Sequence, residues 1–151
     1  MTAASALLPI DACRIFFDGT FSEPRLDHPE CVAIAPDGAV WCGGELGQIY
    51  RIDSDGTRLE QVASTGGFCL GLAFGPEGGL YVCDAVHRSV LRYDLATGAL
   101  HVFADGAGTR RLPLPNHPGS DSAGRLSRPL AAASARTGAA PAPAPSPAQP
   151  A

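Results

Sequence analysis

The stretch that decides the fold is Cys31-Val-Ala-Ile-Ala-Pro-Asp-Gly-Ala-Val-Trp41, because a closely similar stretch, Leu70-Gly-Leu-Ala-Phe-Gly-Pro-Glu-Gly-Gly-Leu-Tyr81, follows one repeat later. Their Pro-acid-Gly turns align, and the match continues with Ile-Tyr-Arg-Ile-Asp at 49–53 against Val-Leu-Arg-Tyr-Asp at 90–94. The sequence therefore contains an internal repeat of about 40 residues, a period typical of repeat architectures.

Each repeat unit predicts four short strands, because runs rich in Val, Ile, Tyr and Phe are separated by the Gly-containing turns that hairpins need. Four hairpin-linked strands in about 40 residues are typical of one blade of a β-propeller. A helical-repeat solenoid of similar period is the alternative, but the Gly and β-branched content disfavours helices. The predicted strands are 31–35, 39–43, 48–53, 58–63, 69–74, 79–84, 89–94 and 99–104.

A third unit begins after the two complete ones and then stops. The segment 118–126 has a Gly turn and the start of a second strand, but Ser-Arg-Pro follows at 127–129, where an apolar strand is expected. Propellers close with about 4 to 8 blades, so two units and part of a third cannot close a ring alone. We therefore predict an all-β fold, with an incomplete β-propeller at 14–126 after an N-terminal segment at 1–13.

The composition changes at residue 127. The stretch 127–151 is rich in Ala and Pro, and Leu130 is its only aliphatic or aromatic side chain larger than Ala. Such a stretch cannot bury enough apolar surface to offset the chain entropy lost on ordering. We predict a disordered tail here.

Composition and charge exclude several classes of function. The chain has 151 residues, 15 acidic and 11 basic side chains and a formal net charge of −4, without a basic stripe for nucleic acid. No basic residue is a lysine, which excludes a Walker-type phosphate loop and a lysine Schiff base. No window approaches the roughly 20 apolar residues of a membrane span, and residues 1–8 lack the positive region of a secretion signal. We therefore expect a cytoplasmic protein without nucleic-acid or membrane partners.

The five cysteines predict free thiols. They are odd in number and form no Cys-x-x-Cys pair, so neither a disulfide framework nor a zinc knuckle is indicated. Because cysteine behaves as a small apolar residue, we expect these thiols to be buried. They are Cys13, Cys31, Cys42, Cys69 and Cys83.

Candidate metal ligands come from the start of the first strand of each unit. In a propeller this strand lines the central channel, so equivalent residues at its start converge on one mouth of the channel. Counting back eight residues from the turn glycine of each unit reaches Glu30, Leu70 and Asn116. Carboxylate and amide oxygens suit a hard cation such as Ca²⁺, Mg²⁺ or Mn²⁺, which can polarise a carbonyl and lower the pKa of a bound water. Glu30 and Asn116 are therefore predicted metal ligands of a hydrolytic site.

Other interpretations of these side chains stay open. Glu30 is alternatively a solvated carboxylate at a strand start, and Asn116 an ordinary turn residue. His28 and His117 each lie beside a proline and are alternative zinc ligands, although the four histidines lack the usual ligand spacing.

The remaining histidines and two aromatic residues are predicted to have structural roles. His87 and His101 are expected on strand surfaces. Trp41 and Tyr81 occupy the same repeat position and are expected in the core.

At these residues the chain resembles the gluconolactonase and regucalcin (senescence marker protein) group of six-bladed β-propellers. The resemblance rests on Leu26-Asp-His-Pro-Glu-Cys-Val-Ala-Ile-Ala-Pro-Asp-Gly-Ala-Val-Trp41, on Gly47-Gln-Ile-Tyr-Arg-Ile-Asp53, and on Leu112-Pro-Leu-Pro-Asn-His-Pro118 with Asp121-x-x-Gly124. It covers about residues 15–126. Strictosidine-synthase-like propellers share the blade pattern and are an alternative within the same resemblance.

The resemblance implies one divalent cation (Ca, Zn, Mg or Mn) in the channel of the complete site, held by a Glu, two Asn and an Asp that also serves in water activation. Glu30 resembles the family's glutamate and Asn116 its first asparagine. The second asparagine and the aspartate belong to later blades that this chain does not contain. Leu114 stands where the family often has an arginine that contacts the substrate, which argues against an acidic sugar lactone.

Two functions follow as expectations. The first is a truncated or frameshifted member of the lactonase-type propellers, whose complete form hydrolyses a small lactone or related ester with one divalent cation; we expect no turnover from this chain alone. The second is a non-catalytic propeller fragment that self-associates through its open blade edges and serves as a binding or scaffold module. The apolar run at 14–18 is expected to be a terminal strand without a partner, which predicts a sticky surface.

Overall fold

The computed structural model describes residues 9–120 and 126–127, and confirms the predicted all-β fold. Apart from the single 3₁₀ turn η1 (Ile10–Ala12), every element in this part of the chain is a strand. No helix among the described residues is long and apolar enough to cross a membrane. The predicted N-terminal segment 1–13 is described only from residue 9, and residues 128–151 of the predicted tail lie outside the described residues.

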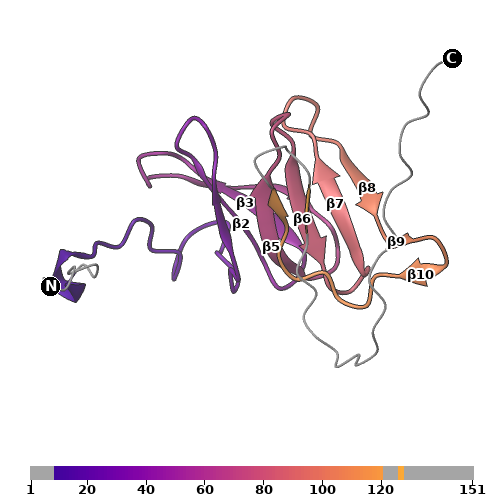
Figure 1. Ribbon diagram of the computed structural model, residues 1–151. Helices are drawn as coiled ribbons and strands as arrows, with labels where there is room; N and C mark the ends of the chain where they lie inside the picture. Colours follow the sequence, from indigo (N-terminus) through magenta and orange to yellow (C-terminus); the bar gives the residue numbers. More distant parts are fainter. Residues whose placement is uncertain (1–8, 121–125, 128–151) are drawn as a thin grey trace, which may run out of the picture.

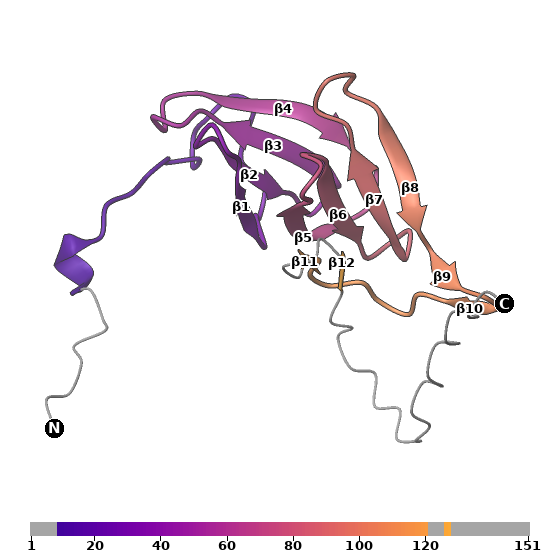
Figure 2. The ribbon, with the colours of Figure 1, turned by 45° about the horizontal axis from the view of Figure 1, so that its top comes forward.

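Two four-stranded antiparallel sheets follow one another along the chain (Figures 1 and 2). Within each sheet the strands lie in sequence order, as in a propeller blade. Every strand end falls within one residue of its predicted position. Blade 1 consists of β1 (Val32–Ile34), β2 (Val40–Gly43), β3 (Gln48–Ile52) and β4 (Leu59–Ser64), and blade 2 consists of β5 (Cys69–Phe74), β6 (Leu80–Asp84), β7 (Ser89–Tyr93) and β8 (Leu100–Ala104).

The repeated Pro-acid-Gly motif forms the turn between the first two strands of each blade. Gly38 and Gly78 have φ angles of +83° and +81°, a region that side chains with a Cβ rarely adopt. The amide of Gly38 donates to the Ala35 carbonyl at 2.9 Å, and the amide of Gly78 donates to the Gly75 carbonyl at 3.0 Å. The glycine is therefore required by the backbone conformation of this turn.

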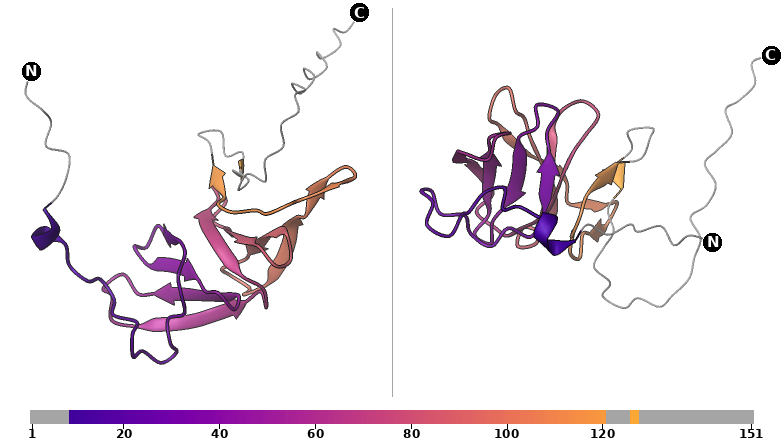
Figure 3. Two further views of the ribbon diagram at one scale, coloured as in Figure 1. Left: turned by 90° about the horizontal axis from the view of Figure 1, so that it is seen from below. Right: turned by 90° about the vertical axis from the view of Figure 1, so that its left-hand side faces the viewer.

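Four shorter strands follow blade 2. The hairpin of β9 (Gly106–Ala107) and β10 (Arg110–Arg111) was not predicted, because two-residue strands carry no apolar pattern. The pairing of β11 (Gly119–Ser120) with β12 (Leu126–Ser127) confirms that a third unit begins. The two blades and this hairpin form an open arc, with β11 beside β5 (Figure 3).

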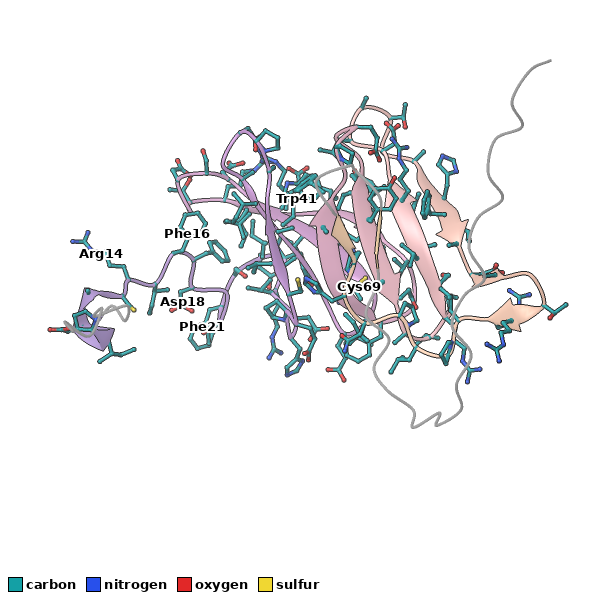
Figure 4. All side chains as sticks on the ribbon, in the orientation of Figure 1. Arg14, Phe16, Asp18, Phe21, Trp41 and Cys69 are labelled. Carbon is teal, nitrogen blue, oxygen red and sulfur yellow. The ribbon has the colours of Figure 1, made fainter. Side chains whose placement is uncertain are left out.

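The two blades pack face to face around Trp41. Its ring meets Phe74 edge-on at a centroid distance of 6.0 Å and Tyr93 at 5.9 Å, and Figure 4 shows it between the two sheets. Tyr81 occupies the equivalent place on the far face of blade 2, where it contacts Phe103 at 4.8 Å and belongs to a cluster with Leu112. Trp41 and Tyr81 are thus core residues, as predicted.

The other face of blade 1 is only partly covered. Phe17 and Leu26, from the stretch between η1 and β1, pack on it, while Val32 and Ile34 of β1 remain 62% and 60% exposed. Residues 14–18 were expected as a terminal strand without a partner; within the described residues they pair with no strand and have no regular strand structure. The predicted sticky surface still has an apolar basis, because Ile15 and Phe16 are exposed.

The burial of the cysteines differs from the prediction at two positions. All five are free, and Cys42, Cys69 and Cys83 are buried, but Cys31 is half-buried and Cys13 is exposed. Cys13 lies outside both blades, so no packed sheet covers it. Desolvation raises the pKa of Cys42 to about 12 and that of Cys69 to about 11.

Candidate functional site

The inner strands of the three units lie next to one another. β1 contacts β5, and β5 contacts β11. Figure 2 shows β11 beside β5. These contacts bring the starts of repeat-equivalent strands close together, at the place where the sequence predicts the channel mouth. This region is the candidate site.

The two predicted ligands lie at this mouth and are open to solvent. Glu30 precedes β1, Asn116 precedes β11, and both side chains are exposed. Within the described residues neither side chain has a hydrogen bond or ion pair. Their oxygens fit a hard divalent cation by chemistry, and the sharing of one cation by both side chains stays a prediction.

The backbone around Asn116 sits directly on blade 2 because residue 71 is a glycine. A Cβ at Gly71 would collide with the Asn116 carbonyl oxygen and would lie 2.6 Å from Cα and 2.8 Å from Nδ1 of His117. The third equivalent position, Leu70, is half-buried and offers no donor atom. Gly71 therefore allows the third unit to approach the first across β5.

A thiol and an imidazole meet at this crossing. Sγ of Cys31 lies 3.5 Å from Nδ1 of His117, although the two residues are 86 positions apart in sequence. The same sulfur lies 3.7 Å from the Leu72 carbonyl oxygen of β5. This pair was not predicted from the sequence, because Cys31 was considered only as a free thiol and His117 only as a single zinc ligand. Counting back seven instead of eight residues from each turn glycine reaches Cys31, Gly71 and His117.

A second group of donors lies beside the start of β1. Nδ1 of His28 is 3.1 Å from a carboxylate oxygen of Asp27 and 3.1 Å from one of Glu45. The potential metal-ligand atoms of these three residues lie within 4.8 Å of one another. The side-chain amide of Gln48 donates a hydrogen bond to the other carboxylate oxygen of Asp27 at 3.3 Å. Sequence reasoning missed this group because Glu45 arrives from the loop between β2 and β3. Both Glu45 and His28 are exposed, and Nδ1 of His28 lies between the two carboxylates.

A buried carboxylate joins two loops at the same end of blade 2. Asp84 is fully buried; its Oδ1 accepts the His87 amide at 2.8 Å, and its Oδ2 lies 3.0 Å from Nδ1 of His87. Gly67 leaves room for it, since a Cβ there would collide with both carboxylate oxygens. Asp84 thus connects the β4–β5 loop with the β6–β7 loop.

The predicted strand-surface position is wrong for His87 and confirmed for His101. His87 lies in the β6–β7 turn, and its Nδ1 is 3.0 Å from Oδ2 of the buried Asp84 carboxylate. His101 is exposed on β8. The difference arises because the β6–β7 turn brings His87 back over the end of β6.

The comparisons with known proteins agree at the level of the fold. No protein-family model and no curated protein matches the sequence. Among solved structures, a gluconolactonase from Xanthomonas campestris is similar with a TM-score of 0.58 and 22% identity, over 65% of this chain and 33% of that chain. A putative gluconolactonase has a TM-score of 0.59 and 21% identity, over 67% and 36%. Virginiamycin B lyase from Staphylococcus aureus has a TM-score of 0.57 and 18% identity, over 70% and 36%.

These likenesses define the fold class: two blades and the start of a third of a β-propeller of the kind found in gluconolactonases. The chain spans about a third of the length of the gluconolactonase structures that it matches. A chain of a nidogen/laminin complex is also similar, with a TM-score of 0.54 and 23% identity over 66% of this chain and 39% of that chain. The same blade arrangement therefore occurs in a protein–protein complex.

Proposed function

We propose that this chain is part of a lactonase-type propeller that binds one divalent cation at the channel mouth and hydrolyses a small lactone or related ester. The observation that carries the proposal is the meeting of the segments before β1 and β11, through Cys31 and His117 across Gly71. Glu30 and Asn116 are the chain neighbours of Cys31 and His117, which supports the proposal that they share one cation. When bound, the cation would polarise the lactone carbonyl and lower the pKa of a water molecule.

The chain's own residues determine access and binding. The exposed Glu30 and Asn116 side chains leave their oxygens free for a cation and the surface open to a substrate. Leu114, half-buried two residues before Asn116, offers no positive charge to a substrate carboxylate. A neutral lactone or ester therefore fits this mouth better than an acidic one. The second Asn and the Asp that the resemblance implies have no counterpart among the described residues.

The test is calorimetric titration of the full chain with Ca²⁺ and Mn²⁺. We expect binding that is weakened in Glu30→Gln and Asn116→Ala and unchanged in the matched control Glu60→Gln. Glu60 is a suitable control because it lies on β4 in an exposed ion pair with Arg58. Binding that does not change in either ligand variant would contradict the proposed site.

Lactone hydrolysis is assayed with the same proteins. We expect no turnover from the chain alone, because it supplies only part of the ligand set. Metal-dependent hydrolysis that disappears in Glu30→Gln would show instead that the chain completes the site by itself.

A second candidate function is a self-associating module, favoured by the open face of blade 1. Val32 and Ile34 are the repeat equivalents of Leu72 and Phe74, whose face in blade 2 is covered by blade 1. A groove of about 670 Å³, with mainly apolar lining, lies over this open face. In a propeller this open face would be covered by the far face of a neighbouring blade, but the far face of blade 2 already packs against Leu112. Among the described residues, the open face of blade 1 in a second copy is therefore the partner that we propose.

Sedimentation velocity tests the module. We expect a dimer that dissociates in Ile34→Glu and persists in the control Ile10→Glu, which adds the same charge at a residue 88% exposed on η1. A monomeric wild-type chain, or a dimer unaffected by Ile34→Glu, would exclude this arrangement.

A further inference from the structure

We propose that Cys31 and His117 together bind a thiophilic divalent cation, Zn²⁺ or Co²⁺, at the channel mouth. The proposal rests on the proposed function in placing a cation at this surface. It uses different side chains, however, and it selects a thiophilic cation over Ca²⁺ and Mg²⁺. Neither residue belongs to the oxygen-donor set of Glu30 and Asn116.

The distance between the two donor atoms fits such an ion. Zinc binds cysteine sulfur at about 2.3 Å and histidine nitrogen at about 2.0–2.1 Å with tetrahedral geometry, which places the two donors about 3.6 Å apart. The observed separation of Sγ of Cys31 and Nδ1 of His117 is 3.5 Å. The pair therefore already spans one edge of a zinc tetrahedron without any movement of the backbone.

The fold holds both donors at this separation. Cys31 immediately precedes β1, and its sulfur also lies against the Leu72 carbonyl oxygen of β5. His117 is pressed onto β5 at Gly71, where a Cβ would lie 2.8 Å from its Nδ1. Since β1 and β11 both contact β5, the donors approach each other across one shared strand. A preorganised pair loses little conformational entropy when it binds a metal.

Exposure distinguishes this thiol from the three buried ones. Cys31 is half-buried and His117 is exposed, so two corners of the tetrahedron stay open to water or to a substrate. Catalytic zinc sites usually combine three protein ligands with one open position, so a site with these two protein ligands is more open than those and than the closed structural sites. A thiolate also favours Zn²⁺ and Co²⁺ over Ca²⁺ and Mg²⁺, which prefer oxygen.

Cobalt spectroscopy of the reduced full chain tests the site. A thiolate bound to tetrahedral Co²⁺ gives a near-ultraviolet charge-transfer band and intense visible bands. We expect both in the wild-type chain, their loss in Cys31→Ser and in His117→Ala, and their bleaching when Zn²⁺ is added. The control Cys13→Ser, which alters the exposed thiol outside the blades, should keep them.

Calorimetry with Zn²⁺ gives a second measurement. We expect Cys31→Ser to weaken Zn²⁺ binding by more than the roughly 10- to 100-fold that loss of a supporting residue costs. Circular dichroism and thermal unfolding establish that each variant is folded, and a second ligand variant, His117→Gln, keeps the test informative where His117→Ala does not fold.

The outcomes separate this proposal from the proposed function. Absence of the charge-transfer band at saturating Co²⁺, or a band that persists in Cys31→Ser, overturns the thiol–imidazole site and shows that the contact is only a hydrogen bond. Ca²⁺ binding that depends on Glu30 can survive that result. Conversely, a Cys31-dependent Co²⁺ band in a chain that does not bind Ca²⁺ or Mn²⁺ supports this site and contradicts the oxygen-donor site.

Discussion

The imidazole of His87 turns back onto the buried carboxylate of Asp84, with Nδ1 of the histidine 3.0 Å from Oδ2 of the aspartate. The same carboxylate accepts the His87 amide at 2.8 Å and lies within 3.5 Å of the Phe68 amide. One side chain therefore fixes the two loops of blade 2 at the end where the candidate site lies.

Replacement of Asp84 by Ala should destabilise the protein. The change removes the charged acceptor of the part-buried His87 amide, and a hydrogen bond to a charged group contributes about 1.5–3 kcal/mol. Urea denaturation followed by circular dichroism measures the loss. Asp105→Ala is the control, because Asp105 forms an exposed ion pair with Arg111 and such pairs contribute about 0–1 kcal/mol. Equal effects of the two substitutions would contradict the bracing role of Asp84.

Stability should fall in acid partly because of Asp84. Burial acts to raise the pKa of this carboxyl, but the His87 amide, the Thr65 hydroxyl and the His87 side chain together outweigh burial and lower the pKa below its ordinary value of 3.8. A carboxyl whose pKa is lower in the folded state stabilises the protein above pH 3.8, and this contribution is lost as the pH falls through the folded-state value. Denaturation midpoints measured from pH 6 to pH 2 should therefore fall more steeply in the wild-type chain than in Asp84→Asn. Parallel profiles would show that another group is responsible.

The strands could be predicted from the sequence because each blade is encoded locally. The Pro-acid-Gly turn needs a glycine with positive φ, and apolar β-branched runs lie on both sides of it, so the eight long strands follow from neighbouring residues alone. The hairpin of β9 and β10 lacks such a pattern, since Arg110 and Arg111 form one of its two strands.

The candidate site could be predicted only in part. Equivalent positions in the repeat predict that Glu30 and Asn116 belong to one surface, and their sharing of a cation stays a prediction. The contact of Cys31 with His117 depends on how closely two blades approach across β5, which the absence of a side chain at Gly71 determines. The contact of His28 with Glu45 depends on the path of the β2–β3 loop. Such long-range distances are properties of packing and not of local sequence.

Gly71→Ala should weaken cation binding at the mouth as well as stability. The added methyl group collides with the Asn116 carbonyl oxygen and lies 2.6 Å from Cα of His117, so the segment before β11 must move away from β5. We expect loss of the cobalt charge-transfer band and weaker Ca²⁺ binding. Gly79→Ala is the matched control, because there the methyl group meets only the flexible Arg92 side chain. If Gly71→Ala binds both metals like the control, the close approach at β5 has no part in the site.

Trp41→Ala should be among the most destabilising substitutions in the protein. Trp41 is 4% exposed and packs between the blades against Phe74 and Tyr93, and truncation of a buried Trp typically costs about 3–5 kcal/mol. Trp41→Phe should cost much less, because it keeps an aromatic ring and the Trp41 Nε1 has no hydrogen-bond partner among the described residues. Urea denaturation followed by circular dichroism compares them. Similar midpoints for the two variants would mean that the blades do not depend on this ring.

The thiols should divide into two classes on alkylation of the native chain. Cys42 and Cys69 are 1% and 0% exposed, and desolvation raises their pKa values to about 12 and about 11. Only the thiolate reacts, so iodoacetamide at pH 8 should modify them far more slowly than Cys13 and Cys31. Peptide mass spectrometry after timed quenching gives the rate for each cysteine, and alkylation in urea, where all five should react alike, is the control. Zn²⁺ should then protect Cys31 and leave Cys13 reactive, since the Cys31 sulfur lies 3.5 Å from an imidazole nitrogen and Cys13 is exposed outside the blades. Equal protection of both thiols would mean that the ion binds cysteine without the help of His117.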